Sequence, residues 1–424
     1  MAQRKQAVLV VVDGLRADMV TPRWAPNLAK LTAQSAWFAQ HASVYPSTTR
    51  TASASIATGC RPSSHGLHGN AMVIDEGQGL VCLSTGKAEF RERLRKATGR
   101  TLLRPALPER LARDGHCVIV SNASPGAAFF QDPDGFGTLY NRAGSHHPGL
   151  KPMAPNEGMS VPKGVAGDAA ATDRFCEDVL AKQRPALAVL WVSEPDNTGH
   201  RNPLGGPEHA KAVAGSDTCV ARVIESVERH CSKDTLVLIT SDHGPETTDR
   251  VIPIEQQLVD AGLKAALDSG DVLVAPQGTS ALVYTSDTAR SRRGAIADFL
   301  RKQDWCGELT VGEDLRALGL PSDGTLAMSV SLRKDPARVN PFGIVGYSDL
   351  MLDRMEDLNH PGCGQHGGLG ENEMRPFLMA WGGRFEPGVR MDDPTSPIDI
   401  APTLLTHLGL PTERTDGRAH RPKG

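Results

Sequence analysis

Three aspartates and three histidines stand in short polar motifs after apolar runs or in a Gly-rich turn: Asp13, Asp196, His200, Asp242, His243 and His366. Asp196 precedes His200 by four residues in "EPDNTGH", and Asp242 and His243 are adjacent in "SDHG". Six such donors can hold two divalent ions, and their mixed carboxylate and imidazole character suits zinc, with manganese as the alternative. Taken singly, each aspartate also fits a helix cap or a turn, so the prediction rests on the six residues together.

The stretch "VYPSTTRTASASIATG", residues 44–59, is rich in serine and threonine. It fits a linker, a helix of small residues packed closely on a sheet, or a nucleophile at the start of a helix. Two neighbouring metal ions favour the third interpretation, because one can activate a nucleophile while the other holds an oxygen of a phosphoryl group. The first turn of a helix also favours an anion through its unpaired N–H groups. The stretch alone leaves open which hydroxyl attacks.

The candidate metal ligands must be positioned by regular secondary structure. In the segments 107–124, 171–196 and 215–244, a predicted helix is followed by an apolar strand. This alternation predicts βαβ units and an α/β fold, with a mostly parallel central sheet covered by helices on both faces. In such sheets the ligand crevice lies beyond the carboxyl ends of the strands. Asp13, Asp196 and Asp242 each follow a predicted strand, so we expect the three carboxylates to converge on one rim.

Changes in composition divide the chain into parts. Residues 125–165 are rich in Gly and Pro, which predicts an irregular surface excursion over the site. From 266 to 345, exposed strands around a helix predict a small inserted α+β cap. The predicted organisation is therefore a catalytic α/β core in two parts, 1–265 and 346–424, with the cap between them.

The overall composition excludes several classes of protein. A net charge of -3 and an aromatic content of 4% argue against a nucleic-acid scaffold. No stretch approaches about 18 uninterrupted apolar residues, so no membrane span is expected. Eight scattered cysteines without a CxxC pair predict free thiols, and the first apolar run is interpreted as a buried strand rather than an export signal. We therefore expect a cytoplasmic location.

The order Asp-Gly, hydroxyl cluster, Asp-x-x-x-His, Asp-His-Gly and His-Gly resembles the alkaline phosphatase superfamily. Within it, the chain is most similar to the branch of type I phosphodiesterases/nucleotide pyrophosphatases and phosphonoacetate hydrolases, over residues 7–70, 187–244 and 360–410. In that superfamily the nucleophile opens a helix that ends at a glycine ten residues later. In the phosphodiesterase branch an asparagine follows 21 residues after the nucleophile. Both counts select Thr49, from Gly59 and from Asn70.

The resemblance also implies a distribution of ligands. One metal would be held by Asp13, Thr49, Asp242 and His243. The other would be held by Asp196, His200 and His366. Asn70 would donate an amide N–H to the charge that develops on the transferred group, although a turn residue between glycines is the alternative interpretation. Attack by Thr49 would give a phospho-threonine intermediate, which water then hydrolyses.

The chain departs from the family next to the nucleophile. Nucleotide pyrophosphatases usually carry an aromatic residue there, and this chain has Arg50, which could bind a carboxylate or a second phosphate or lie solvated. Phosphonoacetate hydrolases bind the substrate carboxylate through lysines, for which Lys151 and Lys163 are the candidates. Asn122 stands where a lysine would have strengthened that alternative.

We therefore predict a metal-dependent phosphodiesterase or phosphonate ester hydrolase that acts on a small molecule. Phosphonoacetate hydrolase, which breaks a C–P bond, is the first alternative, and a nucleotide pyrophosphatase is less favoured. A non-catalytic binding module would usually have lost several ligands, whereas all six are present here. Whether the chain forms a homodimer is left open.

Overall fold

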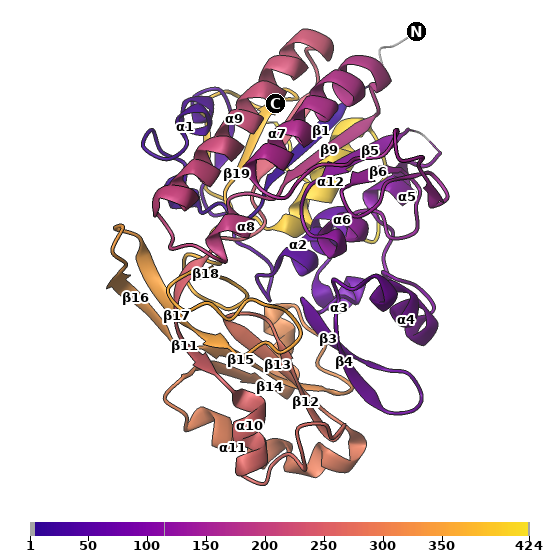
Figure 1. The fold of residues 1–424 in the computed structure, drawn as a ribbon. Coiled ribbons are helices and arrows are strands. Elements are labelled where there is room, and N and C mark those ends of the chain that lie inside the picture. The colour runs from indigo at the N-terminus through magenta and orange to yellow at the C-terminus, as the bar shows by residue number, and fades with distance from the viewer. Residues whose placement is uncertain (1–4, 114, 423–424) are drawn as a thin grey trace.

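The structure is a computed structural model that describes residues 5–113 and 115–422. A ten-stranded sheet forms its centre, in the order β20-β2-β19-β10-β1-β9-β5-β6-β7-β8 (Figure 1). Its strands are β1 (Ala7–Val12), β2 (Ala36–Phe38), β5 (Cys117–Ser121), β6 (Thr138–Asn141), β7 (His146–His147), β8 (Lys151–Pro152), β9 (Leu187–Val192), β10 (Leu236–Thr240), β19 (Leu378–Gly382) and β20 (Arg390–Met391). The strands from β10 to β6 are parallel neighbours, whereas β19, β7 and β8 pair antiparallel. The predicted α/β fold with a mostly parallel central sheet is confirmed.

Helices cover both faces of this sheet, because its central strands are apolar on both sides. Successive residues of β1 point to opposite faces, so that Val10 packs in one core and Leu9 in the other. The first core includes α1 (Pro26–Thr32), α7 (Val165–Arg174), its wider π-helical continuation Phe175–Gln183, and α9 (Pro207–His230). The second core includes α2 (Thr49–Thr58), α5 (Leu107–Leu111), α6 (Pro125–Phe130) and α12 (Ile400–Leu408).

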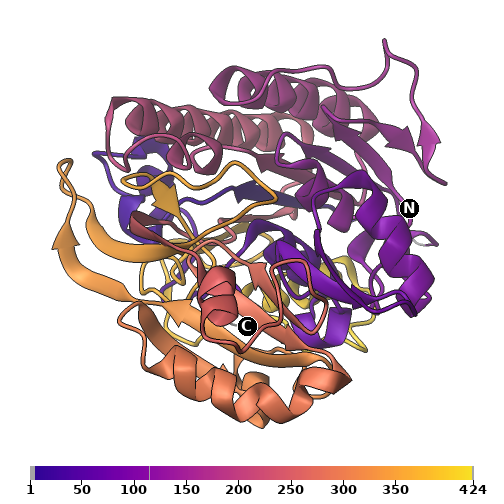
Figure 2. The same ribbon diagram turned by 60° about the horizontal axis from the view of Figure 1, so that its bottom comes forward.

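A second lobe of two smaller sheets lies beyond the carboxyl ends of the central strands (Figures 1 and 2). One sheet has the order β12-β13-β15-β14, with strands Val272–Pro276, Ser280–Thr285, Leu326–Leu332 and Cys306–Val311. The other has the order β16-β17-β11-β18, with strands Lys334–Val339, Val345–Met351, Glu246–Ile252 and Gly364–Gln365. The helices of this lobe are α10 (Ile254–Asp260) and α11 (Arg293–Arg301), which pack in a hydrophobic core separate from those of the large sheet. The strands of this lobe extend on both sides of 266–345, and the domain division stays a prediction.

Several further elements complete the fold. They are the hairpin of β3 (Ala71–Asp75) and β4 (Leu80–Ser84), and the helices α3 (Pro62–His65), α4 (Ala88–Thr98) and α8 (Asp196–Gly199). The segment 125–165, predicted to be irregular, instead contains α6 and the strands β6 to β8, because β6 pairs with β5 and extends the large sheet. None of the eight cysteines forms a disulfide. Among the described helices, none combines the length and the apolar character that crossing a membrane requires.

Candidate active site

Helix α2 places Thr49 at the carboxyl rim of the large sheet. The helix begins at Thr49, directly after Thr48 in extended conformation, and ends before Gly59, which has a φ of 70°. Every residue of α2 is buried, which its small side chains permit because they allow the backbone to approach its neighbours closely. The predicted helix with its glycine end is confirmed. Its first hydroxyl, Thr49 Oγ1, lies 3.0 Å from His243 Nε2.

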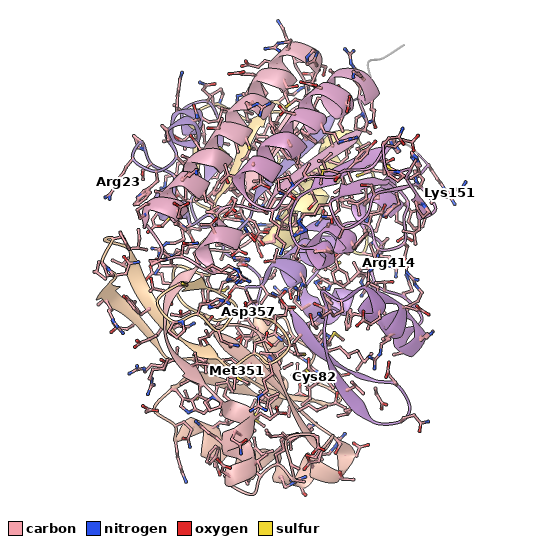
Figure 3. All side chains as sticks on the ribbon, viewed as in Figure 1. Arg23, Cys82, Lys151, Met351, Asp357 and Arg414 are labelled. Carbon is pink, nitrogen blue, oxygen red and sulfur yellow. The ribbon has the colours of Figure 1, made fainter. Side chains whose placement is uncertain are left out.

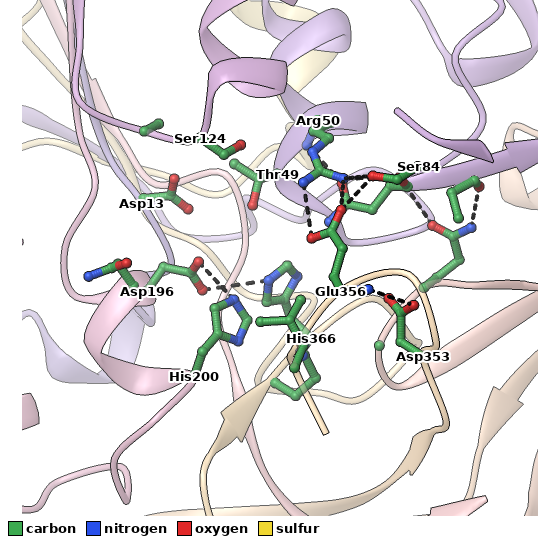
Figure 4. A pocket seen from close by; sticks show the side chains of 18 of the residues that line it. Asp13, Thr49, Arg50, Ser84, Ser124, Asp196, His200, Asp353, Glu356 and His366 are labelled. Carbon is green, nitrogen blue, oxygen red and sulfur yellow. Dashed lines mark hydrogen bonds and ion pairs between the residues drawn. The ribbon is translucent and has the colours of Figure 1, made fainter. Parts of the chain in front are cut away.

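Three adjacent strand ends bring the predicted carboxylates together. β1 lies between β9 and β10 and is parallel to both. Asp13 follows β1, Asp242 follows β10, and Asp196 opens α8 just after β9. His200 directly follows α8, and His366 comes from the second lobe, in the loop after β18. Figure 4 shows Asp13, Asp196, His200 and His366 around one cavity.

Asp13, Asp242 and His243 form what we call the inner cluster, and all three are buried. The protein fixes one oxygen of each carboxylate: Trp191 Nε1 donates to Asp13 Oδ2 at 3.0 Å, and the Gly14 amide donates to Asp242 Oδ1 at 3.1 Å. The remaining oxygens, Asp13 Oδ1 and Asp242 Oδ2, are buried and have no hydrogen-bond partner among the described residues. They lie 3.7 and 3.2 Å from His243 Nε2.

Asp196, His200 and His366 form the outer cluster. Asp196 Oδ2 lies 3.0 Å from His200 Nε2, and Asp196 Oδ1 lies 3.5 Å from His366 Nε2. The Nδ1 atoms of both histidines contact backbone carbonyls, of Gly364 at 3.3 Å for His200 and of Ser47 at 2.7 Å for His366. Because a carbonyl only accepts, each Nδ1 carries a proton, and each Nε2 faces the Asp196 carboxylate.

The electrostatic environment of the two clusters favours the binding of cations. Burial raises the pKa of Asp13 well above its usual value, and the carboxylates of Asp242 and Asp196 raise it further. Burial and the neighbouring His243 ring lower the pKa of His366 well below its usual value. The two rings stack with their centroids 3.6 Å apart. A buried Asp13 carboxylate that its neighbours repel, beside a neutral His366 ring, is a favourable environment for divalent cations.

The donor atoms fit two divalent metal ions. Ligand atoms of Asp13, Asp242 and His243 lie within 4.8 Å of one another, and so do those of Asp196, His243 and His366. The unpartnered oxygens of the inner cluster are the atoms that an ion would take. His243 lies within reach of both positions, whereas the resemblance assigned it to one of them. These two groups together form a candidate two-metal site and leave the identity of the metal open.

Asn70 lies beside Thr49 and is held on several sides. Its side-chain oxygen accepts from the Arg50 amide at 3.3 Å, which leaves its NH2 group free to donate to a ligand. Its backbone amide donates to Gln277 Oε1 at 2.7 Å, and its backbone carbonyl accepts from Arg50 Nη1 at 3.0 Å. The same guanidinium pairs with both oxygens of Glu356, at 2.8 and 3.2 Å. Arg50 is therefore occupied by the protein, and its contacts position Asn70.

Three of these supporting residues were not predicted from the sequence: Trp191, Gln277 and Glu356. Two glycines reflect the packing around Arg50, because a Cβ at Gly86 or Gly126 would lie 2.5 or 2.9 Å from its guanidinium. In the sequence these glycines indicate only turns. Their contribution becomes visible when the fold brings segments together around Arg50.

One of the two candidate lysines lies outside the cavity. Lys151 is exposed on the edge strand β8, at the periphery of the molecule (Figure 3). Lys163 lines the cavity, and so does Arg142, which the sequence did not single out. Asn122 lines it as well. Among the described residues that line the cavity there is no phenylalanine, tyrosine or tryptophan.

Comparisons with known proteins agree with this geometry. A family model described as type I phosphodiesterase/nucleotide pyrophosphatase matches residues 7–313. Ectonucleotide pyrophosphatase/phosphodiesterase family member 7 of Homo sapiens is 42% identical over 65 residues, and its Mus musculus counterpart is 36% identical over 66 residues. These alignments cover 15% of this chain and 14% and 15% of the two relatives, so the chain spans only a small part of the curated relatives that it matches.

Solved structures share the fold over nearly the whole chain. Murine ectonucleotide pyrophosphatase/phosphodiesterase 5 superposes with a TM-score of 0.68 at 18% identity, covering 98% of this chain and 97% of that chain. The human protein gives a TM-score of 0.67 at 17% identity, covering 100% and 97%. An inactive threonine-to-alanine variant of the murine protein, in complex with AMP, gives 0.66 at 17% identity, covering 97% of each.

Proposed function

The chain belongs to the type I phosphodiesterase/nucleotide pyrophosphatase family of the alkaline phosphatase superfamily, and we propose that it hydrolyses small phosphodiesters by covalent attack of Thr49. Membership supports a phosphoric diester hydrolase as the general activity. The observation that carries the finer proposal is the position of Thr49. Its hydroxyl opens a helix and contacts His243, the residue within reach of both proposed metal positions.

The proposed reaction has two displacements at phosphorus. Thr49 Oγ bonds to phosphorus and the first alcohol leaves, which gives a threonyl phosphodiester. The NH2 group of Asn70 and the amino end of α2 stabilise the negative charge on the non-bridging oxygens. Water then replaces Thr49, which regains its proton, and a phosphomonoester is released. Metal ions held by the inner and outer clusters would lower the pKa of the attacking hydroxyl and neutralise the phosphoryl oxygens.

Phosphonoacetate hydrolysis is the second candidate, and one observation favours it. Two cationic side chains, Arg142 and Lys163, line the cavity and could accept a carboxylate. Nucleotide pyrophosphatase activity has weaker support, although the murine relative binds AMP in its variant form. The cavity offers no large aromatic ring on which a base could stack among the described lining residues.

The deciding experiment compares kcat/KM of the zinc-loaded protein on bis(4-nitrophenyl) phosphate and on phosphonoacetate in one buffer. We expect a large preference for the diester, and loss of that activity in Thr49→Ala. A large preference for phosphonoacetate would replace the proposal with the second candidate. Diester hydrolysis that survives intact in Thr49→Ala would remove Thr49 from the mechanism.

Metal identity and location are further proposals. Zinc is favoured by the mixed carboxylate and imidazole donors, and elemental analysis of protein purified without added metal tests it; manganese in its place would correct it. A cytoplasmic location is supported by the eight unpaired cysteines, since oxidising compartments favour disulfides. Fractionation of the source cells tests the location. A homodimer stays a prediction for sedimentation equilibrium.

A further inference from the structure

The cavity around Thr49 contains three cationic side chains in two different electrostatic situations. Arg50 forms an ion pair with Glu356 and donates to the backbone of Asn70. Arg142 and Lys163 line the same cavity, and neither makes an ion pair or a side-chain hydrogen bond with any described residue. The Nε atoms of Arg142 and Arg50 are both buried without a partner among the described residues, so the two arginines differ in their ion pairing. One arginine is therefore neutralised by the protein, and the other is not.

The backbone that carries Arg142 is fixed. Asn141, the last residue of β6, is buried, and its side-chain amide donates to the carbonyls of Ser121 at 2.8 Å and Ala123 at 3.3 Å. Its side-chain oxygen accepts from the Ala143 amide at 2.9 Å, which closes a turn around Arg142. The guanidinium therefore projects from a rigid turn at the carboxyl edge of the sheet. Because this backbone is already fixed, only the side chain of Arg142 has to be ordered when it binds an anion.

The segment that carries Lys163 is tied to the same edge. The carbonyl of Pro162, the residue before Lys163, accepts a hydrogen bond from the side-chain amide of Asn122 at 3.3 Å. Asn122 itself follows β5 and lines the cavity. Lys163 is exposed, so its ammonium group can turn toward a ligand that enters the cavity.

Asp168, the acidic residue that raises the pKa of Arg142, already accepts hydrogen bonds from other residues. Burial lowers the pKa of Arg142, and Asp168 opposes that effect. The Asp168 carboxylate, however, accepts from the backbone amides of Ser193 at 2.9 Å and Glu194 at 3.0 Å and from the Asn122 amide at 2.9 Å. A partly buried guanidinium without a partner is costly, and a bound anion would remove that cost.

We propose that Arg142 and Lys163 form a subsite for an anionic group, a carboxylate or a phosphate, that the substrate carries beyond its scissile phosphoryl group. This inference rests on the proposed function of the same cavity. Arg142 supplies a planar fork suited to either anion, and Lys163 supplies a second charge. The preferred substrates are therefore diesters, or related phosphonates, with a second negative charge on one alcohol.

The test uses 4-nitrophenyl phosphodiesters that differ only in the second alcohol, which carries a carboxylate, a phosphate or an uncharged methyl ester. In Arg142→Gln, we expect kcat/KM to fall roughly 10- to 100-fold for the charged substrates and to change less than about threefold for the uncharged one. Arg142→Lys should recover part of the loss. Lys163→Gln should act in the same direction, and Lys151→Gln, on the exposed edge, is the matched control. Of the carboxylate and phosphate substrates, the one whose kcat/KM falls more in Arg142→Gln identifies the anion that the subsite binds.

A binding measurement separates this inference from the proposed function. Calorimetric titration of the three compounds into Thr49→Ala, with and without Arg142→Gln, reports affinity without requiring turnover. Weaker binding of only the charged compounds supports the subsite, even if the wild-type protein hydrolyses none of them. Equal affinity of all three compounds in both backgrounds, or an equal loss for charged and uncharged compounds, would overturn it.

Discussion

The inner and outer clusters contain the same kinds of donor but are built differently. The inner cluster comes entirely from strand ends of the large sheet and is supported by neutral donors, the Trp191 indole and the Gly14 amide. The outer cluster needs a histidine from the second lobe. The side chains of Asp196 and His200 remain 13% exposed, whereas those of Asp242 and His243 are fully buried. We therefore predict that metal binding at the inner position is independent of the second lobe, whereas binding at the outer position depends on how the lobes are held together.

Replacement of Thr49, which contacts His243 of the inner cluster, has the largest expected effect. Thr49→Ala should lower kcat/KM on bis(4-nitrophenyl) phosphate by roughly 10⁴-fold or more, because the covalent route is removed. Thr49→Ser keeps a hydroxyl at the helix start and should retain far more activity. The metal content of both variants should match that of the wild-type protein, because both retain all six carboxylate and imidazole ligands. Loss of metal in Thr49→Ala would mean that its inactivity has a structural cause.

Removal of one ligand from each cluster tests the comparison itself. Asp242→Asn should abolish tight binding at the inner position, whereas His200→Ala should leave one ion tightly bound. We expect activity to fall at least roughly 100-fold in both, because the proposed chemistry uses both ions. Metal analysis after dialysis against a weak chelator distinguishes the variants. Equal release of all metal from His200→Ala would contradict an independent inner position.

Glu373 tests the dependence of the outer cluster on the second lobe. It is buried, accepts from the amides of Gly368 and Gly370, both at 2.9 Å, and pairs with Lys334 of β16. It thereby fixes the loop that presents His366. Glu373→Gln should weaken metal binding at the outer position by roughly 10-fold and leave the inner position unchanged.

A matched control for this variant lies in the same loop. Glu371 is exposed and, within the described part of the chain, its ion pair is with Arg375, so Glu371→Gln should leave both metal affinities unchanged. Weaker binding at both positions in Glu373→Gln would show that the loop supports the whole centre rather than the outer cluster alone.

The smallest expected effect concerns pH. Asp168 holds the backbone before Asp196, and burial raises its pKa to about 6. The folded protein therefore binds more protons than the unfolded chain between about pH 4 and pH 6, so this carboxyl lowers the free energy of unfolding as pH rises through that range. In urea denaturation, we expect the free energy of unfolding to change by on the order of 2 kcal/mol across this pH range, and we expect a flatter pH dependence in Asp168→Asn. A steeper pH dependence in the variant would contradict the assignment.

Local sequence patterns predicted the strand ends and the helix that Thr49 opens, because apolar periodicity and a glycine stop are readable from neighbouring residues. They did not predict the pairing of Arg50 with Glu356, which are 306 positions apart and meet only through packing of the two lobes. The same limit applies to Arg142, which was missed, and to Lys151, which was chosen from the resemblance to phosphonoacetate hydrolases. Isolated basic residues carry no local signal of whether an acidic partner will neutralise them.

The most direct test of covalent attack by Thr49 is the stereochemistry at phosphorus. A 4-nitrophenyl phosphorothioate diester of one configuration would be hydrolysed in ¹⁸O-labelled water, and the configuration of the product determined. Each in-line displacement inverts phosphorus, so attack by Thr49 followed by attack of water predicts net retention. Net inversion would show that water attacks the substrate directly, and it would contradict the central claim.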